Sequence, residues 1–292
     1  MAEVERLLGL SMIGILAGGV YGLLAVGLSL QIGVCRVLNI THGEFLMLGG
    51  VLTFTLAGLG INPLLAPVII GPLLFGIGFL LQATLFKRIK VRAPSPAAFE
   101  GNALLAAFGV MYIISYLARL RFGTRALPSQ YLTEGVPFVG INLAVNLIVG
   151  FAIAAAVGIA VYLFLTRSRL GRAIRATAED QPTAELMGVN TNTVLALCFG
   201  LGALLAGIAG TLISMRTPVT TAMGFNNTVI ALIVVTLGGL GSVPGSFIAG
   251  IIIGVASMLV AGLWESVLIV PVYYAMLMVL LLARPTGIFG KK

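Results

Sequence analysis

Long stretches without a charged side chain dominate this chain. Seven runs contain no Asp, Glu, Lys or Arg: 7–35, 45–86, 101–118, 135–166, 186–215, 217–264 and 266–283. Because a membrane-spanning helix needs about 20 apolar residues, the runs 45–86 and 217–264 each have room for two. The pattern predicts eight or nine hydrophobic segments, about nine if they are placed at 8–30, 42–59, 64–85, 101–118, 143–165, 194–214, 225–237, 246–263 and 267–283.

The apolar runs are continuous, as in 73–85, whereas strands of an outer-membrane barrel alternate apolar and polar residues. Backbone groups in lipid must pair within their own element, which long apolar runs achieve as helices. Only 9% of the 292 residues are charged, against about 25% in an average soluble domain. We therefore expect an all-α, polytopic membrane helix bundle that occupies residues 1–292 as a single transmembrane domain.

Small residues recur four apart in several segments. At this spacing they share one helix face and allow a neighbouring backbone to approach closely. Tight packing inside the bundle is one interpretation, and close approach to a substrate path is the other. The stripes are Gly14, Gly18 and Gly22; Ala203 and Gly207; Ala206 and Gly210; and Ser246, Gly250 and Gly254.

The distribution of Lys and Arg predicts the orientation, because cytoplasmic loops carry the excess of basic residues. With the N-terminus outside and all nine segments crossing, 12 basic residues lie inside and 5 outside; if 225–237 dips in and returns, the count is 9 to 8. The crossing arrangement, with a cytoplasmic C-terminus, is favoured. The net charge of +8 then reflects orientation in the membrane and not nucleic-acid binding. The inner set is Arg36, Lys87, Arg88, Lys90, Arg92, Arg167, Arg169, Arg172, Arg175, Arg284, Lys291 and Lys292.

The longest inner loop, 166–193, contains the signals of a short helix. Asp180 is a plausible N-cap, Pro182 and Glu185 suit the first turn, and Gly188 suits the position after the last turn. These signals predict a cytoplasmic helix over Pro182–Met187, parallel to the membrane. Such a short helix needs a surface to pack against, and it offers Ala184, Leu186 and Met187. That surface is either a groove of a partner protein or the lipid.

Two polar groups interrupt the apolar pattern within the spans. Asn39, Thr41, His42 and Glu44 stand where the first segment ends and the second begins. They can cap and pin the second helix, line a permeation path, or, through His42, relay protons. Asn226, Asn227 and Thr228 open the short segment 225–237, where they either face a polar substrate or cap the helix.

The usual signatures of enzymes are missing from the sequence. None of the four Lys is followed by Ser or Thr, so no P-loop is present, and the glycines of Leu237–Gly245 read as a tight turn. One His cannot build a His-based metal cluster, and Cys35 and Cys198 lack metal or disulfide spacing. We expect a transport protein that is not an enzyme, holds no cofactor or metal of its own, and takes its energy from elsewhere.

Several motifs together resemble the branched-chain amino acid ABC permease family of the LivH type. They are Tyr21-Gly-Leu-Leu-Ala-Val-Gly-Leu-Ser-Leu30, Asn39-Ile-Thr-His-Gly-Glu44, Arg175-Ala-Thr-Ala-Glu-Asp180, Ala184-Glu-Leu-Met-Gly188, Leu237-Gly-Gly-Leu-Gly-Ser-Val-Pro-Gly245 and Arg284-Pro-Thr-Gly-Ile-Phe-Gly290. The resemblance runs from about residue 14 to 290 and implies a multi-pass subunit of the bacterial inner membrane. It also implies a second, homologous permease, two cytoplasmic subunits that bind ATP and Mg, and an external binding protein that delivers leucine, isoleucine or valine.

The resemblance places the contact with the ATP-binding subunits on the predicted cytoplasmic helix. The residues concerned are Arg172, Arg175, Asp180, Pro182, Ala184, Glu185, Leu186, Met187 and Gly188. Relatives of this family also move urea, amides or other amino acids, so these substrates stay open. A stand-alone channel or an ion-coupled carrier that uses His42 and Glu44 is the alternative from another class, and a scaffold for other proteins is a third.

Overall fold

The computed structural model describes residues 2–128, 131–138, 141–284 and 286–290, and most of them are helical. Lys291 and Lys292, which enter the charge count above, and Pro285 of the last motif lie outside the described residues. The elements are α1 Ala2–Cys35, α2 His42–Gly58, α3 Ala66–Leu81, the π-helical η1 Gln82–Phe86, α4 Lys87–Arg92, α5 Pro96–Phe122, β1 Gly135–Phe138, β2 Ile141–Ala144, α6 Val145–Arg167, α7 Arg169–Glu179, α8 Gln181–Leu186, α9 Thr191–Ser214, α10 Met223–Gly238, α11 Val243–Leu263, the 3₁₀-helical η2 Ser266–Leu268 and α12 Ile269–Ala283.

The structure confirms the predicted class, a polytopic helical bundle. Seven helical stretches within the described residues are long and apolar enough to cross a membrane, and α10 is a shorter apolar helix. Each of the nine predicted segments coincides with a helix. The segments 42–59 and 225–237 become α2 and α10, which have 17 and 16 residues and fall short of a spanning length.

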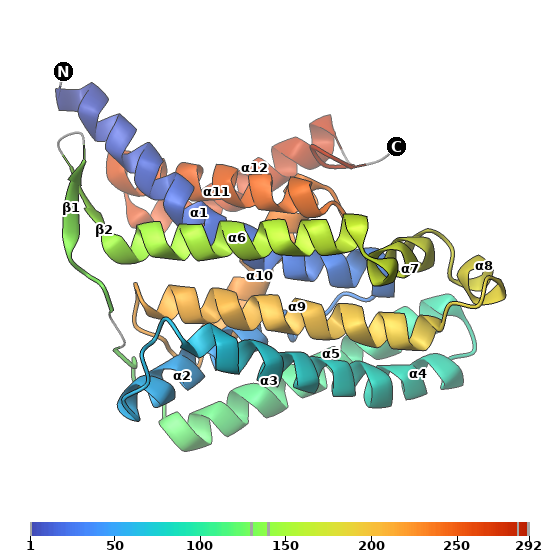
Figure 1. Ribbon diagram of the computed structural model, residues 1–292. Helices are drawn as coiled ribbons and strands as arrows, with labels where there is room; N and C mark the ends of the chain where they lie inside the picture. The colour runs from blue at the N-terminus through green and yellow to red at the C-terminus, as the bar shows by residue number, and fades with distance from the viewer. Residues whose placement is uncertain (1, 129–130, 139–140, 285, 291–292) are drawn as a thin grey trace.

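The two ends of the bundle differ in what they carry. The chain begins at one end and finishes toward the other, beyond which α7 and α8 project (Figure 1). We call the latter the α8 end. The opposite end carries the antiparallel hairpin β1–β2, whose register pairs Gly135 with Ala144. The apolar pattern gave no hint of this hairpin, because its strands are only four residues long.

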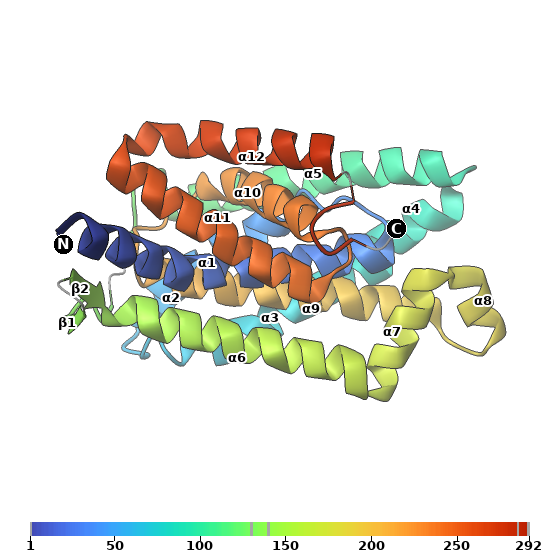
Figure 2. The same cartoon turned by 90° about the horizontal axis from the view of Figure 1, so that it is seen from above.

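Two of the predicted small-residue stripes face each other where α1 packs on α11 (Figure 2). A Cβ added at Gly18 would lie 2.6 Å from the carbonyl oxygen of Gly250, and one at Gly22 would lie 2.7 Å from that of Phe247. Real Cβ atoms do not come this close, so the two backbones touch only because side chains are missing. The packing interpretation is therefore the one that applies to this pair, which we call the α1–α11 seam.

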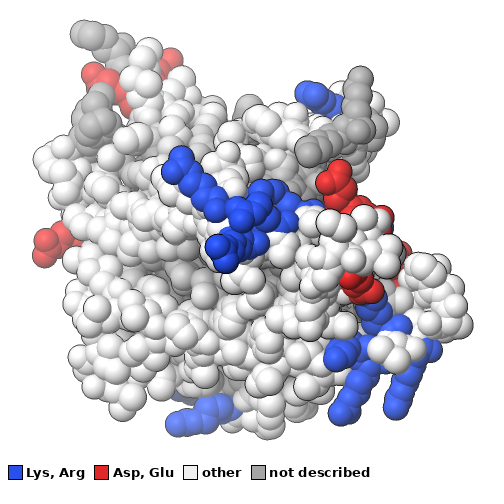
Figure 3. Space-filling view, turned by 45° about the vertical axis from the view of Figure 1, so that its right-hand side comes forward, with Lys and Arg blue, Asp and Glu red and all other residues white. Residues whose placement is uncertain are grey.

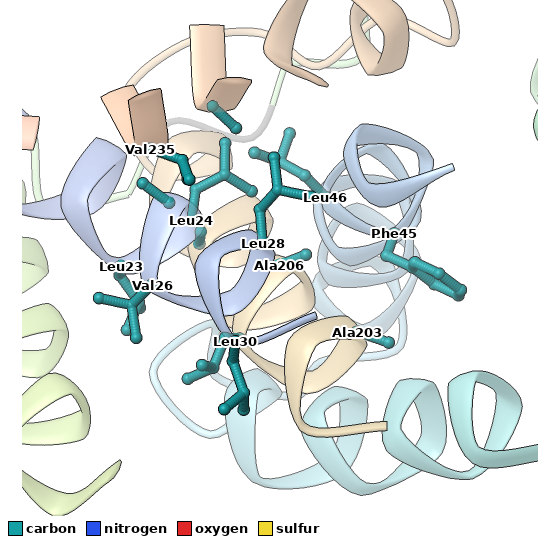
Figure 4. Packing of buried hydrophobic residues seen from close by; sticks show 14 of the residues in the cluster. Leu23, Leu24, Val26, Leu28, Leu30, Phe45, Leu46, Ala203, Ala206 and Val235 are labelled. Carbon is teal, nitrogen blue, oxygen red and sulfur yellow. The ribbon is translucent and has the colours of Figure 1, made fainter. Parts of the chain in front are cut away.

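Helix α9 is the centre of the remaining core. A Cβ at Gly49 of α2 would lie 2.8 Å from the Cα of Gly207, and one at Gly78 of α3 would lie 2.7 Å from the Cβ of Ala203. Larger side chains fill the space between these contacts. Figure 4 shows Leu24 and Leu28 of α1 beside Leu46, Ala206 and Val235, all of which are buried.

The C-terminal segment returns to the turn between α10 and α11. The amide nitrogen of Ile288 donates to the carbonyl of Leu237 (2.9 Å), and that of Phe289 donates to Gly238 (3.2 Å). These bonds satisfy carbonyls that the last turn of a helix leaves open. Gly239 has φ +98°, and a Cβ there would meet the backbone of Gly290. The predicted tight turn at 237–245 is present, and its glycines admit the tail.

Candidate functional site

The predicted cytoplasmic helix exists as α8, shifted by one residue at each end. The prediction was Pro182–Met187 and the structure has Gln181–Leu186. The amide nitrogens of Gly188 and Val189 donate to the carbonyls of Glu185 (2.9 Å) and Ala184 (3.0 Å), and Gly188 has φ +84°. This is the Schellman arrangement, in which a left-handed glycine closes the helix. Gly188 therefore ends α8 in the way its sequence position predicts.

Asp180 occupies the N-cap position of α8 but does not cap the helix with its side chain. Its carboxylate instead accepts a hydrogen bond from the hydroxyl of Thr183. Asp180 also ends the preceding helix, α7, with an extended backbone at φ −150° and ψ 110°. The predicted N-cap position is therefore confirmed, although the side chain of Asp180 does not cap the helix.

The apolar residues of α8 divide between two sides. Ala184 is 4% exposed and packs inward, whereas Leu186 is 87% and Met187 81% exposed. The prediction grouped all three on one docking surface, and that grouping needs correction. Ala184 fixes α8 to its own subunit, and the surface that the helix presents outward consists of Leu186 and Met187.

Helix α7 carries α8 away from the bundle. The sequence analysis predicts a loop here, whereas Arg169–Glu179 is a helix whose Gly171, Ile174 and Thr177 are buried. Arg172 and Arg175 are exposed on its other side. A repeat of about three or four residues between the buried positions is the signal of an amphipathic helix, and it is readable from the sequence.

Side-chain hydrogen bonds tie the α7–α8 joint to the bundle. Lys90 Nζ of α4 donates to Gln181 Oε1 (2.7 Å), and Gln181 Nε2 donates to the carbonyl of Val34 in α1 (3.3 Å). The hydroxyl of Thr191 at the start of α9 donates to Glu185. Three different elements, α4, α1 and α9, therefore hold α8 by side-chain hydrogen bonds.

Basic side chains gather at the α8 end. Lys87, Arg88, Lys90 and Arg92 belong to α4, while others lie on α7 or beside the ends of α1, α6 and α12. Figure 3, in which this end comes forward, shows Lys and Arg in clusters on a surface that is otherwise largely uncharged. The basic residues that the sequence analysis assigned to the inner loops therefore lie mostly at one end of the bundle.

The second predicted site lies inside the bundle, where α2 and α10 both begin. The His42 Nε2 atom lies 3.0 Å from the carbonyl of Leu24, which is 11 residues before the end of α1. At 1.5 Å per residue, α2 starts roughly 16 Å from that end. A Cβ at Gly43 would lie 2.8 Å from the amide nitrogen of Thr228. Two helix N-termini therefore meet at mid-depth, an arrangement known from the discontinuous helices of transporters.

Thr228 caps α2 from across the bundle. Its Oγ1 accepts a hydrogen bond from the amide nitrogen of Gly43 (2.8 Å) and donates to the carbonyl of Ile40 (3.0 Å). Thr41, at the N-cap position, makes no side-chain cap. The cap predicted from Asn39 or Thr41 thus comes from Thr228, which lies 185 positions after the Gly43 amide that it caps, and a local pattern cannot indicate this.

The other polar residues of this cluster mostly bond to their own subunit. Asn39 Oδ1 accepts from the Thr41 amide (3.1 Å), Asn39 Nδ2 donates to Gln31 Oε1 (3.0 Å), and the Thr41 hydroxyl donates to the carbonyl of Ala107 in α5 (2.9 Å). His42 donates to a carbonyl through Nε2, which fixes its tautomer. This pinning is the structural role anticipated for the group. Gln31 was missed, although a Gln in an apolar span is itself a signal.

Three predicted residues, His42, Glu44 and Asn226, keep polar atoms free of such bonds, and in His42 the free atom is Nδ1, which has no partner among the described residues. Glu44 is 2% exposed, and its Oε2 has no hydrogen-bond partner within the described part of the chain. Asn226 is exposed at the start of α10, one residue before Asn227, which donates to the carbonyl of Met223 in its own helix (2.8 Å). The structure brings together Asn39, Thr41, His42, Glu44 and Thr228, and it leaves Asn226 and Asn227 at the edge of this group. The substrate role of these residues stays a prediction.

A helical membrane bundle in which two short helices begin inside the bundle is an architecture found among membrane transport proteins. Comparison with known sequences identifies the family of membrane proteins. The family described as branched-chain amino acid transport system / permease component matches residues 11–283. This chain belongs to that family, and it is a multi-pass membrane protein.

Individual relatives agree over nearly the whole length. The high-affinity branched-chain amino acid transport system permease protein BraD of Pseudomonas aeruginosa is 30% identical, with 100% of this chain and 98% of the relative covered. The permease protein LivH of the corresponding system in Salmonella typhimurium is 32% identical, with 95% and 94% covered. The ribose import permease protein RbsC of Escherichia coli is more distant, at 26% identity with 80% and 72% covered.

Proposed function

We propose that this chain is the membrane-spanning permease subunit of an ATP-binding-cassette importer for leucine, isoleucine and valine. The family and the names of relatives such as BraD and LivH support this cargo. The importer lies in the bacterial inner membrane, with the N-terminus outside and the α8 end in the cytoplasm. The basic side chains at the α8 end support this orientation.

The observation that carries the proposal is the geometry of α8. A helix that leaves Leu186 and Met187 almost fully exposed, while three elements hold its base, is suited to receive force from a partner. Two cytoplasmic ATP-binding subunits bind ATP and Mg and press on α8 of this chain and its counterpart in a second, homologous permease. Arg172 and Arg175 face acidic groups of the same partner.

The cargo arrives from an external binding protein and passes by alternating access. ATP can shift the equilibrium between the two states only through its different affinity for each of them, so α8 must be joined firmly to the spans. The start of α2 and α10 is the place where these spans are interrupted. Three polar groups there keep atoms without a partner, His42, Glu44 and Asn226. Of these, Glu44 suits the ammonium of an amino acid and Asn226 suits the carboxylate.

The test uses the complex purified from its native membranes. Proline has φ near −65° and no amide hydrogen, so Gly188→Pro cannot adopt φ +84° or donate to Glu185. We expect normal membrane insertion and at least a tenfold loss of substrate-stimulated ATP hydrolysis. In Gly58→Pro, at the last residue of α2, α8 stays intact and the coupling should persist. Unchanged stimulation in Gly188→Pro would exclude the docking role.

The rival, a channel or ion-coupled carrier that acts alone, is tested by reconstitution of the single chain in liposomes. The proposal expects no leucine uptake without the ATP-binding subunits, even under an imposed pH gradient. Uptake by the complex in competition with isoleucine, valine, urea and ribose then defines the cargo. A preference for urea or ribose would still support an importer but would show that its substrate is not a branched-chain amino acid.

A further inference from the structure

A cavity of about 430 Å³ lies at the α8 end, apart from the polar cluster inside the bundle. Its walls come from the end of α1, from η1, from α4 and the start of α5, from the α7–α8 joint and from α9. A cleft of this volume with mostly apolar walls and a few polar groups is the usual form of a small-molecule site.

One buried amide in the wall lacks a partner. Gln82 is 4% exposed, lines the cavity, and makes no hydrogen bond with any described residue through its Oε1. A buried polar group without a partner destabilises a fold by about 1–3 kcal/mol, so its persistence calls for a ligand or an ordered water. Rotation of the amide exchanges its oxygen and nitrogen, which lets Gln82 accept from an ammonium or donate to an anion.

The backbone at Gln82 is also unusual. Gln82 opens η1, a π-helical stretch between α3 and α4. Short π-helical segments are rare and occur frequently at functional sites, because they displace side chains from the regular helical positions. The sequence pattern predicted an ordinary continuous span here. The irregular turn and the unpartnered amide coincide at one wall of the cavity.

The charged residues of the wall are of both signs. Arg36 and Lys90 are cationic, and Glu100 and Asp180 are anionic. Glu100 and Asp180 would repel a simple anion, and Arg36 and Lys90 would repel a simple cation. A molecule that carries both an ammonium and an anionic group can interact favourably with both pairs. Phe99 and Leu195 add apolar surface.

We propose that this cavity binds a zwitterion that joins an ammonium to an anionic group, with Gln82 as its buried hydrogen-bond partner. Two sources supply this chemistry: a free amino acid from the adjoining solution, and the headgroup of phosphatidylethanolamine. A ligand here touches α4, α5 and the α7–α8 joint together, where Lys90 already bonds to Gln181. Occupancy of the cavity therefore holds α8 in place and slows ATP hydrolysis. This effect on hydrolysis rests on the proposed function of α8, whereas the binding of the zwitterion does not rest on it.

The experiment measures binding of radiolabelled L-leucine to the purified complex in phosphatidylcholine nanodiscs, without the external binding protein. Isocaproate and isoamylamine compete as analogues that carry only the carboxylate or only the ammonium. We expect L-leucine to bind and both analogues to compete at least tenfold more weakly than unlabelled L-leucine. Gln82→Leu and Glu100→Gln should each lower the affinity for L-leucine about tenfold, which is the effect of one lost hydrogen bond. Arg88→Gln, on α4 but outside the cavity, should bind as the unmodified protein does.

The same complexes in phosphatidylethanolamine nanodiscs distinguish the two sources. If phosphatidylethanolamine occupies the cavity, the unmodified protein binds less L-leucine in phosphatidylethanolamine nanodiscs than in phosphatidylcholine nanodiscs. Gln82→Leu should then bind L-leucine equally in the two lipids. This outcome also supports the site. Leucine binding that is equal in Gln82→Leu, Glu100→Gln and the unmodified protein, in both lipids, would overturn the proposal. This binding measurement uses no ATP hydrolysis. The proposed zwitterion site can therefore be disproved while the Gly188→Pro experiment supports the role of α8, and the role of α8 can be disproved while the zwitterion site is supported.

Discussion

The α1–α11 seam and α8 both depend on glycine, but for opposite reasons. At Gly18 an added Cβ would lie 2.6 Å from a backbone oxygen of the facing helix. At Gly188 nothing lies within 4 Å, and the glycine is needed only for its φ of +84°. In the seam the chain completes its own packing, whereas at α8 it leaves Leu186 and Met187 uncovered.

This difference separates what folds the subunit from what the subunit offers to others. Burial of small residues in the seam stabilises the bundle and leaves no surface for a partner. Exposed apolar side chains on α8 contribute little to the fold and form a small patch of the kind that marks interaction sites. Substitutions in the two regions should therefore separate stability from coupling.

The largest effect is expected for Gly18→Leu in the seam. Its side chain would have to enter the backbone of α11, and overpacking of this kind destabilises by about 3 kcal/mol or more. We expect almost no monodisperse protein on size-exclusion chromatography in detergent. Gly109→Leu on α5, where nothing lies within 4 Å, is the matched control. Equal yields for the two variants would mean that the seam does not limit stability.

An intermediate effect is expected for Thr228→Val. The change keeps the shape and removes the hydroxyl that joins Gly43 to Ile40, at a cost of about 1–2 kcal/mol. The measurement is the thermal unfolding midpoint in detergent, which should fall in Thr228→Val and stay near its original value in Thr228→Ser. If serine and valine behave alike, the hydroxyl is not the cap of α2.

The smallest effect on stability is expected for Met187→Ser. Exposed positions usually change the free energy of unfolding by less than about 0.5 kcal/mol, and Met187 is 81% exposed. The midpoint should hardly move, while substrate-stimulated ATP hydrolysis falls. A clear loss of stability would show that Met187 packs within the subunit and would remove the contrast with the seam.

The sequence predicts those features that depend on neighbours along the chain. All nine hydrophobic segments and the ending of α8 at Gly188 follow from local composition and from the conformational freedom of glycine. The stripes of Gly18 and Gly250 were visible too, although nothing local states that one packs on the other.

The features that escaped prediction depend on partners far away in the sequence. Thr228 caps α2 because folding brings α10 beside it, and the orphaned amide of Gln82 is apparent only when its surroundings are known. Helix α7 is a different case, because the spacing of its buried residues is amphipathic and is visible in the sequence, although the loop prediction does not use it. Within the site, sequence reasoning named Glu44 but could not separate it from Thr41, whose hydroxyl bonds to the carbonyl of Ala107 in the same subunit.

The tail beyond α12 has a practical consequence for anyone who handles this protein. Ile288 and Phe289 fasten the last residues to the open carbonyls of Leu237 and Gly238, with Gly290 against Gly239. A truncation after α12 would strip that fastening and uncover the α10–α11 hairpin beneath it. Affinity tags and fluorescent fusions are best attached through a flexible spacer that starts after Gly290, so that Ile288 and Phe289 can still bond to Leu237 and Gly238.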